Sequence, residues 1–286
     1  MEIYPVHISN FKVDGGVMFG VVPKAIWNKK YPADENNLIT LSLRSLLVKV
    51  QERLILIDTG WGDKQDESFF KHAHIHDGDG LEGGLQRHGF ALEDVTDVVL
   101  THLHADHCGG TIRLGEGERK YEPVFPNATV YVSRDQWNWA IKPNIRERDA
   151  FLPENIMPIQ EMGRLRLVSE DAELFPGFEV RMVEGHTPGQ MVPILHLGDR
   201  RLIFAADLIP TASHIPLLFN MAYDLFQLDT ISEKEKMLNE AQENQDILFF
   251  EHDVYHECCS LKKTERGIRA DQIFTLGDYL AGNAPK

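Results

Sequence analysis

The chain has 286 residues, 43% of them hydrophobic, which is enough for a substantial core in one large domain or two. Acidic residues outnumber basic ones 44 to 29, the net charge is −15, and no stripe rich in Lys and Arg occurs. This balance disfavours a nucleic-acid substrate, because binding a polyanion requires basic patches. No apolar run reaches the length of a membrane-spanning helix, so we expect no insertion into a membrane.

The start of the chain and its cysteines predict a cytoplasmic protein. Residues 1–8 lack the basic and apolar regions of a signal peptide. Three cysteines leave no even disulfide framework, and two of them, Cys258 and Cys259, are neighbours. Reduced thiols are the simpler account of this pattern. Cys108 is expected to be a small buried packing residue.

The first third of the chain predicts a hairpin, an insertion and a helix, in that order. Strands over 40–50 and 53–58 would pair in a hairpin that closes near residues 51–52. The segment 61–80 is polar and becomes glycine-rich at its end, as expected of a loop insertion that borders a site. Residues 81–88 predict a helix that stops at the following glycine.

The rest of the chain alternates between short apolar strands and helices. A charged helix is predicted over 232–245, opened by a serine cap with Glu235 three residues later, and a closing helix is predicted over 263–280. Residues 142–158 contain three prolines and predict irregular structure. The remaining predicted elements are strands over 98–101, 129–132, 178–183, 201–206 and 247–251 and a helix over 134–141.

The most informative stretch is residues 102–107, which read His-Leu-His-Ala-Asp-His directly after an apolar strand. Imidazole nitrogens suit zinc, copper, iron or nickel, and the carboxylate extends the choice to manganese. Four ligand-type residues are more than one tetrahedral ion takes in a catalytic site that keeps a position open for water. The cluster therefore predicts two metal ions, with further ligands supplied from elsewhere.

Three downstream residues can supply those ligands. His186 lies just beyond the predicted strand 178–183, Asp207 ends an apolar run, and His252 follows a third buried-strand pattern. Each lies at the end of a short hydrophobic strand, where α/β architectures place their chemistry. We therefore expect these side chains to converge with residues 102–107.

Other polar residues leave two interpretations open. Asp58 also ends a strand and could accept a proton from a ligand imidazole, but a plain Asp-Thr-Gly turn explains it nearly as well; Thr101 could act in the same way. His72, His74 and His76 alternate along the chain, yet they lie in a Gly- and Asp-rich neighbourhood that favours a solvated loop over a further metal site.

Taken together, His-x-His-x-Asp-His, His-Thr-Pro-Gly, Ala-Asp and a final His resemble the metallo-β-lactamase fold superfamily over roughly residues 40–255. The resemblance implies an α/β (α+β) fold, a four-layer αββα sandwich, in a single hydrolase domain over 1–286 with the insertion near 61–80. It also implies two divalent ions, with zinc expected and Mn²⁺, Co²⁺ or iron as alternatives. The implied ligands are His102, His104 and His186 for the first ion and Asp106, His107 and His252 for the second, with Asp207 bridging.

Residues 101–110, 206–210 and 250–253 further resemble a branch that contains N-acyl-homoserine lactonases, which act in quorum quenching, and methyl parathion hydrolases. That resemblance implies a metal-bridging hydroxide that opens a lactone or cleaves an ester, Asp106 and Asp207 as catalytic residues, and a homodimer. The alternatives are a phosphotriesterase or arylesterase and, less favoured because the tail after Cys259 is short, a thioesterase of the glyoxalase II type. No Gly-x-Ser-x-Gly elbow supports a serine hydrolase.

Substrate contacts are predicted less sharply than the ligands. Six residues lie in expected loops or short helices that could form an apolar rim over the metals, although core packing explains each of them equally well. They are Trp61, Phe69, Phe70, Phe219, Met221 and Tyr223. A non-catalytic metal-binding sensor is disfavoured, because the ligand set is complete.

Overall fold

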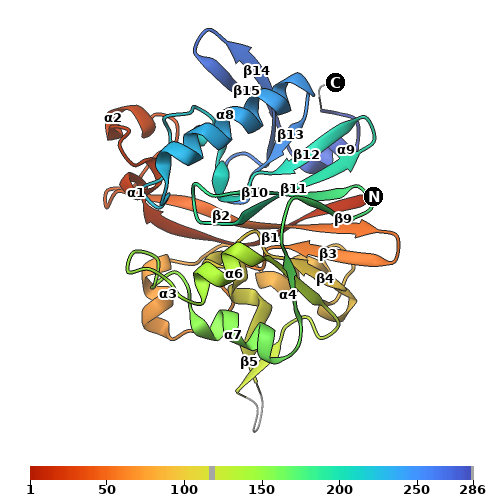
Figure 1. The fold of residues 1–286 in the computed structure, drawn as a ribbon. Coiled ribbons are helices and arrows are strands. Elements are labelled where there is room, and N and C mark those ends of the chain that lie inside the picture. The colour runs from red at the N-terminus through yellow and green to blue at the C-terminus, as the bar shows by residue number, and fades with distance from the viewer. Residues whose placement is uncertain (116–119, 285–286) are drawn as a thin grey trace.

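The computed structural model describes residues 1–115 and 120–284. Two sheets face each other between outer layers of helices (Figure 1). The first sheet has the order β1-β2-β3-β4-β7-β8 and the second the order β15-β14-β13-β12-β11-β10-β9. The strands of the first sheet are β1 (Glu2–Asp14), β2 (Leu38–Val50), β3 (Arg53–Ile57), β4 (Asp97–Val99), β7 (Thr129–Ser133) and β8 (Leu165–Val168).

The second sheet is formed by the later part of the chain. Its strands are β9 (Ala172–Phe175), β10 (Phe178–Val183), β11 (Gln190–Leu197), β12 (Arg200–Phe204), β13 (Ile247–Phe249), β14 (Cys258–Thr264) and β15 (Gly267–Phe274). A separate ribbon pairs β5 (Ile112–Leu114) with β6 (Tyr121–Pro123). The helices are α1 (Gly15–Phe19), α2 (Lys24–Trp27), α3 (Glu67–Ala73), α4 (Gly80–Gln86), α5 (Ala105–Cys108), α6 (Arg134–Ala140), α7 (Pro153–Glu161), α8 (Gln227–Glu243) and α9 (Leu276–Leu280).

The β3 strand shows why its sequence is apolar without interruption. Successive side chains of a strand point to opposite faces of the sheet. Leu54 and Leu56 pack in the core cluster that also holds residues of α4, α6 and α7, whereas Ile55 and Ile57 pack in the cluster between the two sheets. A strand that is buried on both faces needs apolar residues at every position.

The same division holds in the second sheet. Phe204 and Phe249 pack between the sheets, and their neighbours Ile203 and Leu248 pack against Met237 of α8. Helices therefore cover both outer faces, as Figure 1 shows for α8 on one side and α6 and α7 on the other. The predicted four-layer αββα sandwich is confirmed.

Strand direction brings the polar strand ends together. β3, β4, β7 and β8 are parallel neighbours, and β12 and β13 are parallel in the second sheet. β10 runs in the same direction as β12, because each is antiparallel to β11. The carboxyl ends of these strands therefore meet at one edge of the sandwich, where Asp58, His102, His186, Asp207 and His252 follow them.

Most predicted elements are present with small shifts at their ends. The hairpin of β2 and β3 turns at Gln51, which has a φ of 52°. α6 matches the predicted helix over 134–141, and α4 ends shortly before Gly89, whose φ is 80°. The helix predicted over 232–245 begins earlier, at Gln227, so Ser232 lies inside it and does not cap it.

Besides the serine cap, the predicted structure of two segments is wrong. The closing helix predicted over 263–280 is a β-hairpin of β14 and β15 that turns at residues 265–266, followed by the short α9. The segment 142–158 is not irregular to its end, because α7 begins at Pro153, a favourable first position for proline, and also contains Pro158. The insertion 61–80 holds α3, whose first turn is capped by the Asp66 carboxylate.

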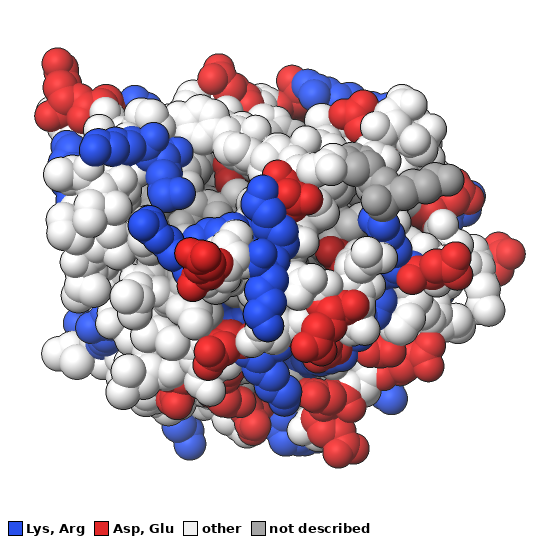
Figure 2. All heavy atoms as spheres, turned by 90° about the horizontal axis from the view of Figure 1, so that it is seen from above, with Lys and Arg blue, Asp and Glu red and all other residues white. Residues whose placement is uncertain are grey.

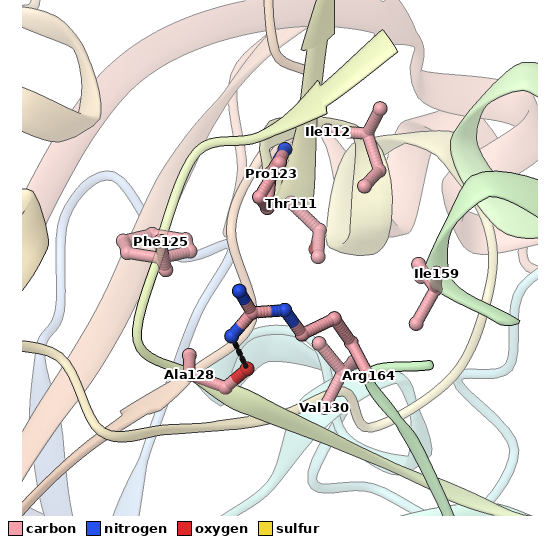
Figure 3. A pocket seen from close by; sticks show the side chains of 8 residues that line it. All are labelled: Thr111, Ile112, Pro123, Phe125, Ala128, Val130, Ile159 and Arg164. Atoms are coloured by element: carbon pink, nitrogen blue, oxygen red, sulfur yellow. Dashed lines mark hydrogen bonds between the residues drawn. The ribbon is translucent and has the colours of Figure 1, made fainter. Parts of the chain in front are cut away.

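A small cavity lies beneath the first sheet, between the start of β5 and α7 (Figure 3). Its volume of about 10 Å³ is space for roughly one water molecule, so it is not a substrate site. The Arg164 guanidinium enters it and donates a hydrogen bond to the carbonyl oxygen of Ala128.

In the described ranges, no helix is long and apolar enough to cross a bilayer.

Candidate metal centre

Residues 102–107 lie at the shared edge of the sandwich in two short segments, an extended one after β4 and then the helical turn α5. β4 ends at Val99, and its continuation carries the buried Thr101 and His102. His104 then directly precedes α5, a single turn that holds Asp106 and His107. An extended segment followed by a helical turn thus points both kinds of ligand-type side chain toward the same place.

Three of the predicted ligands form a tight group. His104 Nδ1 lies 3.0 Å from His102 Nε2 and 3.2 Å from His186 Nε2. His102 and His186 are buried, and His104 is nearly so. The structure therefore brings together the three side chains that were predicted to hold the first ion, although they come from the two halves of the chain.

A second group lies beside the first. His107 Nε2 is 3.3 Å from His252 Nε2, and Asp106 Oδ2 lies 3.6 Å and 3.8 Å from these two nitrogens. These are the three residues predicted to hold the second ion.

Asp207 lies between the two groups. Its Oδ2 is 3.2 Å from His186 Nε2, and its Oδ1 is 3.1 Å from His252 Nε2. The preceding Ala206 has a φ of 43°, in the left-handed region that an alanine rarely adopts, and this turn directs Asp207 inward from the end of β12. One carboxylate thus presents one oxygen to each group.

The ring nitrogens that face away from the first group all meet oxygen. His186 Nδ1 lies 3.0 Å from the Asp224 carboxylate, and His104 Nε2 lies 3.2 Å from the Glu147 carboxylate. His102 Nδ1 lies 3.0 Å from the Thr101 hydroxyl, which itself donates a 2.6 Å hydrogen bond to Asp58. Because that hydroxyl proton is already used, the hydroxyl oxygen accepts from His102.

The second group has the same arrangement. His107 Nδ1 lies 3.0 Å from Asp58 Oδ2 and 3.2 Å from Glu251 Oε2. His252 Nδ1 donates to the backbone carbonyl of Ser42, 2.9 Å away, and Ser42 N donates to the carbonyl of His252. These contacts hold each imidazole in one orientation.

The donor set fits divalent cations. In a neutral imidazole, a proton held on the outer nitrogen leaves a lone pair on the inner nitrogen. When all five imidazoles are neutral, as metal binding requires, five such lone pairs point into one small space, and Asp207 Oδ1 is buried there without a hydrogen bond from the described residues. Lone pairs at this separation repel one another unless a cation lies among them. Histidine nitrogens with carboxylate oxygens are ligands of zinc and its neighbours in the first transition row.

The buried carboxylates and neutral imidazoles of the site also favour a bound cation. Burial lowers the pKa of His102 well below its usual range, which keeps the imidazole in the neutral form that binds metals. Burial also lowers the pKa of His252, but the carboxylates of Asp207 and Glu251 outweigh it and raise that pKa to about 9. Although burial opposes ionisation of Asp207, the histidines around it hold its pKa well below the usual range. The carboxylates thus attract a cation.

Sequence reasoning found some of the supporting residues and missed others. Asp58 contacts His107 and Thr101 contacts His102, which favours the first of the two interpretations left open for them. Asp224, Glu147 and Glu251 were not predicted. Only Glu251 had a signal, its position next to His252 at a strand end; the other two lie in segments without a recognisable pattern.

The alternating histidines do not join the centre. His72 and His74 are exposed, and His76 pairs through its backbone with Asn10 of β1. Within the described residues, none of the three belongs to a group of ligand-type side chains. The interpretation as a solvated segment fits, except that His72 lies on α3.

The six predicted rim residues divide into two kinds. Met221 is buried in the core, and Phe219 packs against it, so core packing explains both. Trp61 lines a cavity of about 280 Å³ together with Ile8, Leu43 and Ile75, and its ring packs on Phe11, which in turn packs on His252. Phe69, on α3, packs on Trp61, and Phe70 packs on Phe69. Tyr223 is half exposed next to Asp224, and burial with Asp106 nearby raises its pKa.

Comparisons with known proteins agree with this geometry. The model of the metallo-beta-lactamase superfamily matches residues 44–252. An N-acyl homoserine lactonase from Bacillus cereus is 24% identical over 238 residues, which cover 77% of this chain and 85% of that protein.

Solved structures show the same fold over nearly the whole length. A probable metal-dependent hydrolase from Staphylococcus aureus is 27% identical, with a TM-score of 0.86 over 96% of this chain and 98% of its own. AidC, a dizinc quorum-quenching lactonase solved with a product, has a TM-score of 0.79 at 23% identity, covering 96% and 95% of the two chains. The chain belongs to the metallo-beta-lactamase superfamily and is a metallo-hydrolase.

Proposed function

We propose that the protein is a dinuclear hydrolase that opens lactones, and that its substrates are N-acyl-homoserine lactones. The observation that carries the dinuclear part is Asp207, whose two oxygens face two separate imidazole groups. The substrate class is supported by the lactonases among the similar proteins. Zinc is the proposed metal, because imidazole and carboxylate ligands suit it.

The residues present would hold the ions in two sets. His102, His104 and His186 would bind the first and Asp106, His107 and His252 the second, with Asp207 shared. When bound, such ions lower the pKa of water from about 15.7 toward 7 and polarise the substrate's carbonyl oxygen.

The protein's own groups orient the proposed ligand imidazoles and transfer a proton. Asp58, Asp224 and the Ser42 carbonyl fix the imidazoles, so that the ligand nitrogens are in place before substrate arrives. The Asp106 side chain is 20% exposed against 10% for Asp207. We therefore assign to Asp106 the transfer of a proton from the attacking water to the leaving alkoxide, and to Asp207 a bridging role.

Surface and cavity properties favour a small neutral substrate. The cavity beside Trp61 is apolar on several sides and has room for an acyl chain. On the face drawn in Figure 2, Lys and Arg side chains are interspersed with Asp and Glu and form no continuous basic band. The net charge of −15 also repels polyanions at long range.

The cytoplasmic location and the homodimer are each proposed from a single observation. All three cysteines are free and buried, which supports a reducing, cytoplasmic environment. The homodimer is carried over from the resemblance to lactonases, and light scattering of the purified protein tests it.

The decisive experiment combines metal analysis with a substrate panel. We expect two equivalents of metal per chain. We also expect the highest kcat/KM on homoserine lactones of several acyl lengths, compared with paraoxon-type triesters, aryl esters and a glutathione thioester. A preference for phosphotriesters or aryl esters by orders of magnitude would select the alternative activity in the same site. A single tightly bound ion in a fully active enzyme would contradict the dinuclear centre.

A further inference from the structure

A buried carboxylate outside the proposed ligand set contacts four groups. Glu147 Oε1 accepts hydrogen bonds from His104 Nε2, 3.2 Å away, and from the Thr187 hydroxyl, 2.8 Å away. Glu147 Oε2 accepts from Trp139 Nε1 at 2.6 Å and from Asn144 Nδ2 at 2.7 Å. Glu147 is only 4% exposed, so these four donors replace water around its charge.

These contacts join three parts of the chain. His104 comes from the segment after β4, and Thr187 follows His186 in the segment after β10. Trp139 lies on α6, and Glu147 itself lies in the connection between α6 and α7. One side chain thus ties two ligand-bearing segments to a third segment that carries no ligand.

The contact with His104 fixes the state of that imidazole. A carboxylate only accepts hydrogen bonds, so the His104 proton must lie on Nε2, and the Nδ1 lone pair points toward His102 and His186. Without this acceptor, the proton can move to Nδ1, or the ring can turn, and either change removes one of three donors from the first group. The second group makes no contact with Glu147 among the described residues.

We propose that Glu147 is a positioning residue that sets the affinity of the first metal position, the one formed by His102, His104 and His186, and leaves the second position unaffected. The inference rests on the ligand sets of the proposed function. Loss of a hydrogen bond of this kind to a ligand histidine weakens metal binding by about 10- to 100-fold.

Cobalt titration of the metal-free protein tests the inference. Co²⁺ added to the wild type, Glu147→Gln and Glu161→Gln is followed by visible absorption and calorimetry, and the unfolding temperature of each metal-free protein is measured. Glutamine keeps the size of Glu147 but offers one acceptor oxygen to four donors. Glu161 is an exposed carboxylate on α7 and serves as the matched control. A further variant, Trp139→Phe, removes one donor without touching a ligand.

We expect Glu147→Gln to weaken one of two cobalt-binding steps by about 10- to 100-fold, to shift the absorption band of that step and to leave the other step unchanged. Glu161→Gln should match the wild type, and Trp139→Phe should fall between the two. Unchanged affinities in Glu147→Gln, or equal weakening of both steps together with a lower unfolding temperature of the metal-free protein, would overturn the inference.

The same titration separates this inference from the proposed function. A wild type that binds no cobalt contradicts both. A wild type that binds one cobalt contradicts the dinuclear centre, and the inference then holds if Glu147→Gln weakens that single step and fails if it does not. A wild type with two steps and an unchanged variant contradicts the inference alone.

Discussion

At the scale of single residues, Asp207 is the side chain that lies between the two proposed ligand groups. Its two oxygens lie 3.2 Å from His186 Nε2 and 3.1 Å from His252 Nε2. In Asp207→Asn one of these oxygens is replaced by an amide NH2 group, which cannot bind a cation. We expect the variant to lose metal and to lose activity by about 100-fold or more. Metal analysis and kcat/KM measured together check this, with the exposed Asp199→Asn as control. Full metal content with full activity would contradict the bridging role.

Asp58 has a different role, because it touches ligands and not the proposed ions. It accepts from Thr101 N at 2.7 Å, from the Thr101 hydroxyl at 2.6 Å and from His107 Nδ1 at 3.0 Å. An asparagine leaves at least one of these buried donors unpaired, which costs about 1–3 kcal/mol. We therefore expect Asp58→Asn to lower the free energy of unfolding by that amount and kcat/KM by about 10- to 100-fold.

Urea unfolding and steady-state kinetics measure the two effects of Asp58→Asn separately. If Asp58 forms only a strand-end turn, the stability falls while kcat/KM per bound metal stays at the wild-type value. That result would reject its role as a partner of His107.

At the scale of elements, an ion-pair network fastens α8 to the second sheet. Both carboxylate oxygens of Glu240 bind Arg181 of β10, at 2.6 Å and 2.8 Å, and one of them also binds Arg201 of β12 at 2.9 Å. The hydrogen bonds from Arg181, with those from Arg201, lower the pKa of Glu240 from 4.5 to about 2. Because the unfolded chain binds this proton at a higher pH, the network stabilises the fold above pH 4.5, and its contribution disappears as the pH falls toward 2.

We expect Glu240→Gln to destabilise the protein by about 1 kcal/mol at pH 7, since the network is partly exposed. The difference from the wild type should shrink between pH 4.5 and pH 2. Urea unfolding at pH 7, 4 and 3 measures it, with the exposed Glu243→Gln of the same helix as control. A difference that is constant across this range would mean that Glu240 acts by packing and not by its charge.

Elements also show what the sequence could predict and what it could not. Short hydrophobic segments with polar ends predicted β3, β4, β10, β12 and β13. Burial on both faces leaves a direct trace in the composition of β3, β4 and β13, whereas the partly exposed positions of β10 and β12 carry polar residues. The hairpin of β14 and β15 was mistaken for a helix, since its exposed positions carry Lys262, Lys263 and Arg266 and favour no period clearly. Gly267, which starts β15 directly after the turn at residues 265–266 and has a φ of 90°, is the residue that favours a hairpin here.

The sequence likewise predicts some residues of the site and not others. Ligand-type residues were predictable because they follow strands, and a strand end has a recognisable sequence. Glu147 and Asp224 were not, since each lies in a connection whose path is set by tertiary packing. Their acidic side chains resemble those of any solvated loop, and only the fold brings them to within 3.2 Å of His104 and His186.

At the scale of the whole molecule, the centre joins the two halves of the sandwich. His102, His104 and His107 come from the first sheet, whereas His186, Asp207 and His252 come from the second. The unfolded chain cannot assemble the whole set, because His186, Asp207 and His252 are separated from residues 102–107 and from one another by long stretches of sequence. A ligand that binds only the folded state stabilises it by RT ln(1 + [L]/Kd), about 4 kcal/mol when its concentration is 1,000 times Kd. Metal binding should therefore fasten the two sheets together.

Removal of metal tests this directly. We expect dialysis against dipicolinate to lower the unfolding temperature, by roughly 2–4 °C for each kcal/mol lost in a protein of this size. Two equivalents of zinc should restore it and one equivalent should restore part of it. Asp207→Asn, which lacks the bridge, should gain less from zinc than the wild type does. If the metal-free wild type unfolds at the same temperature as the loaded one, the cations do not connect the two halves of the sandwich.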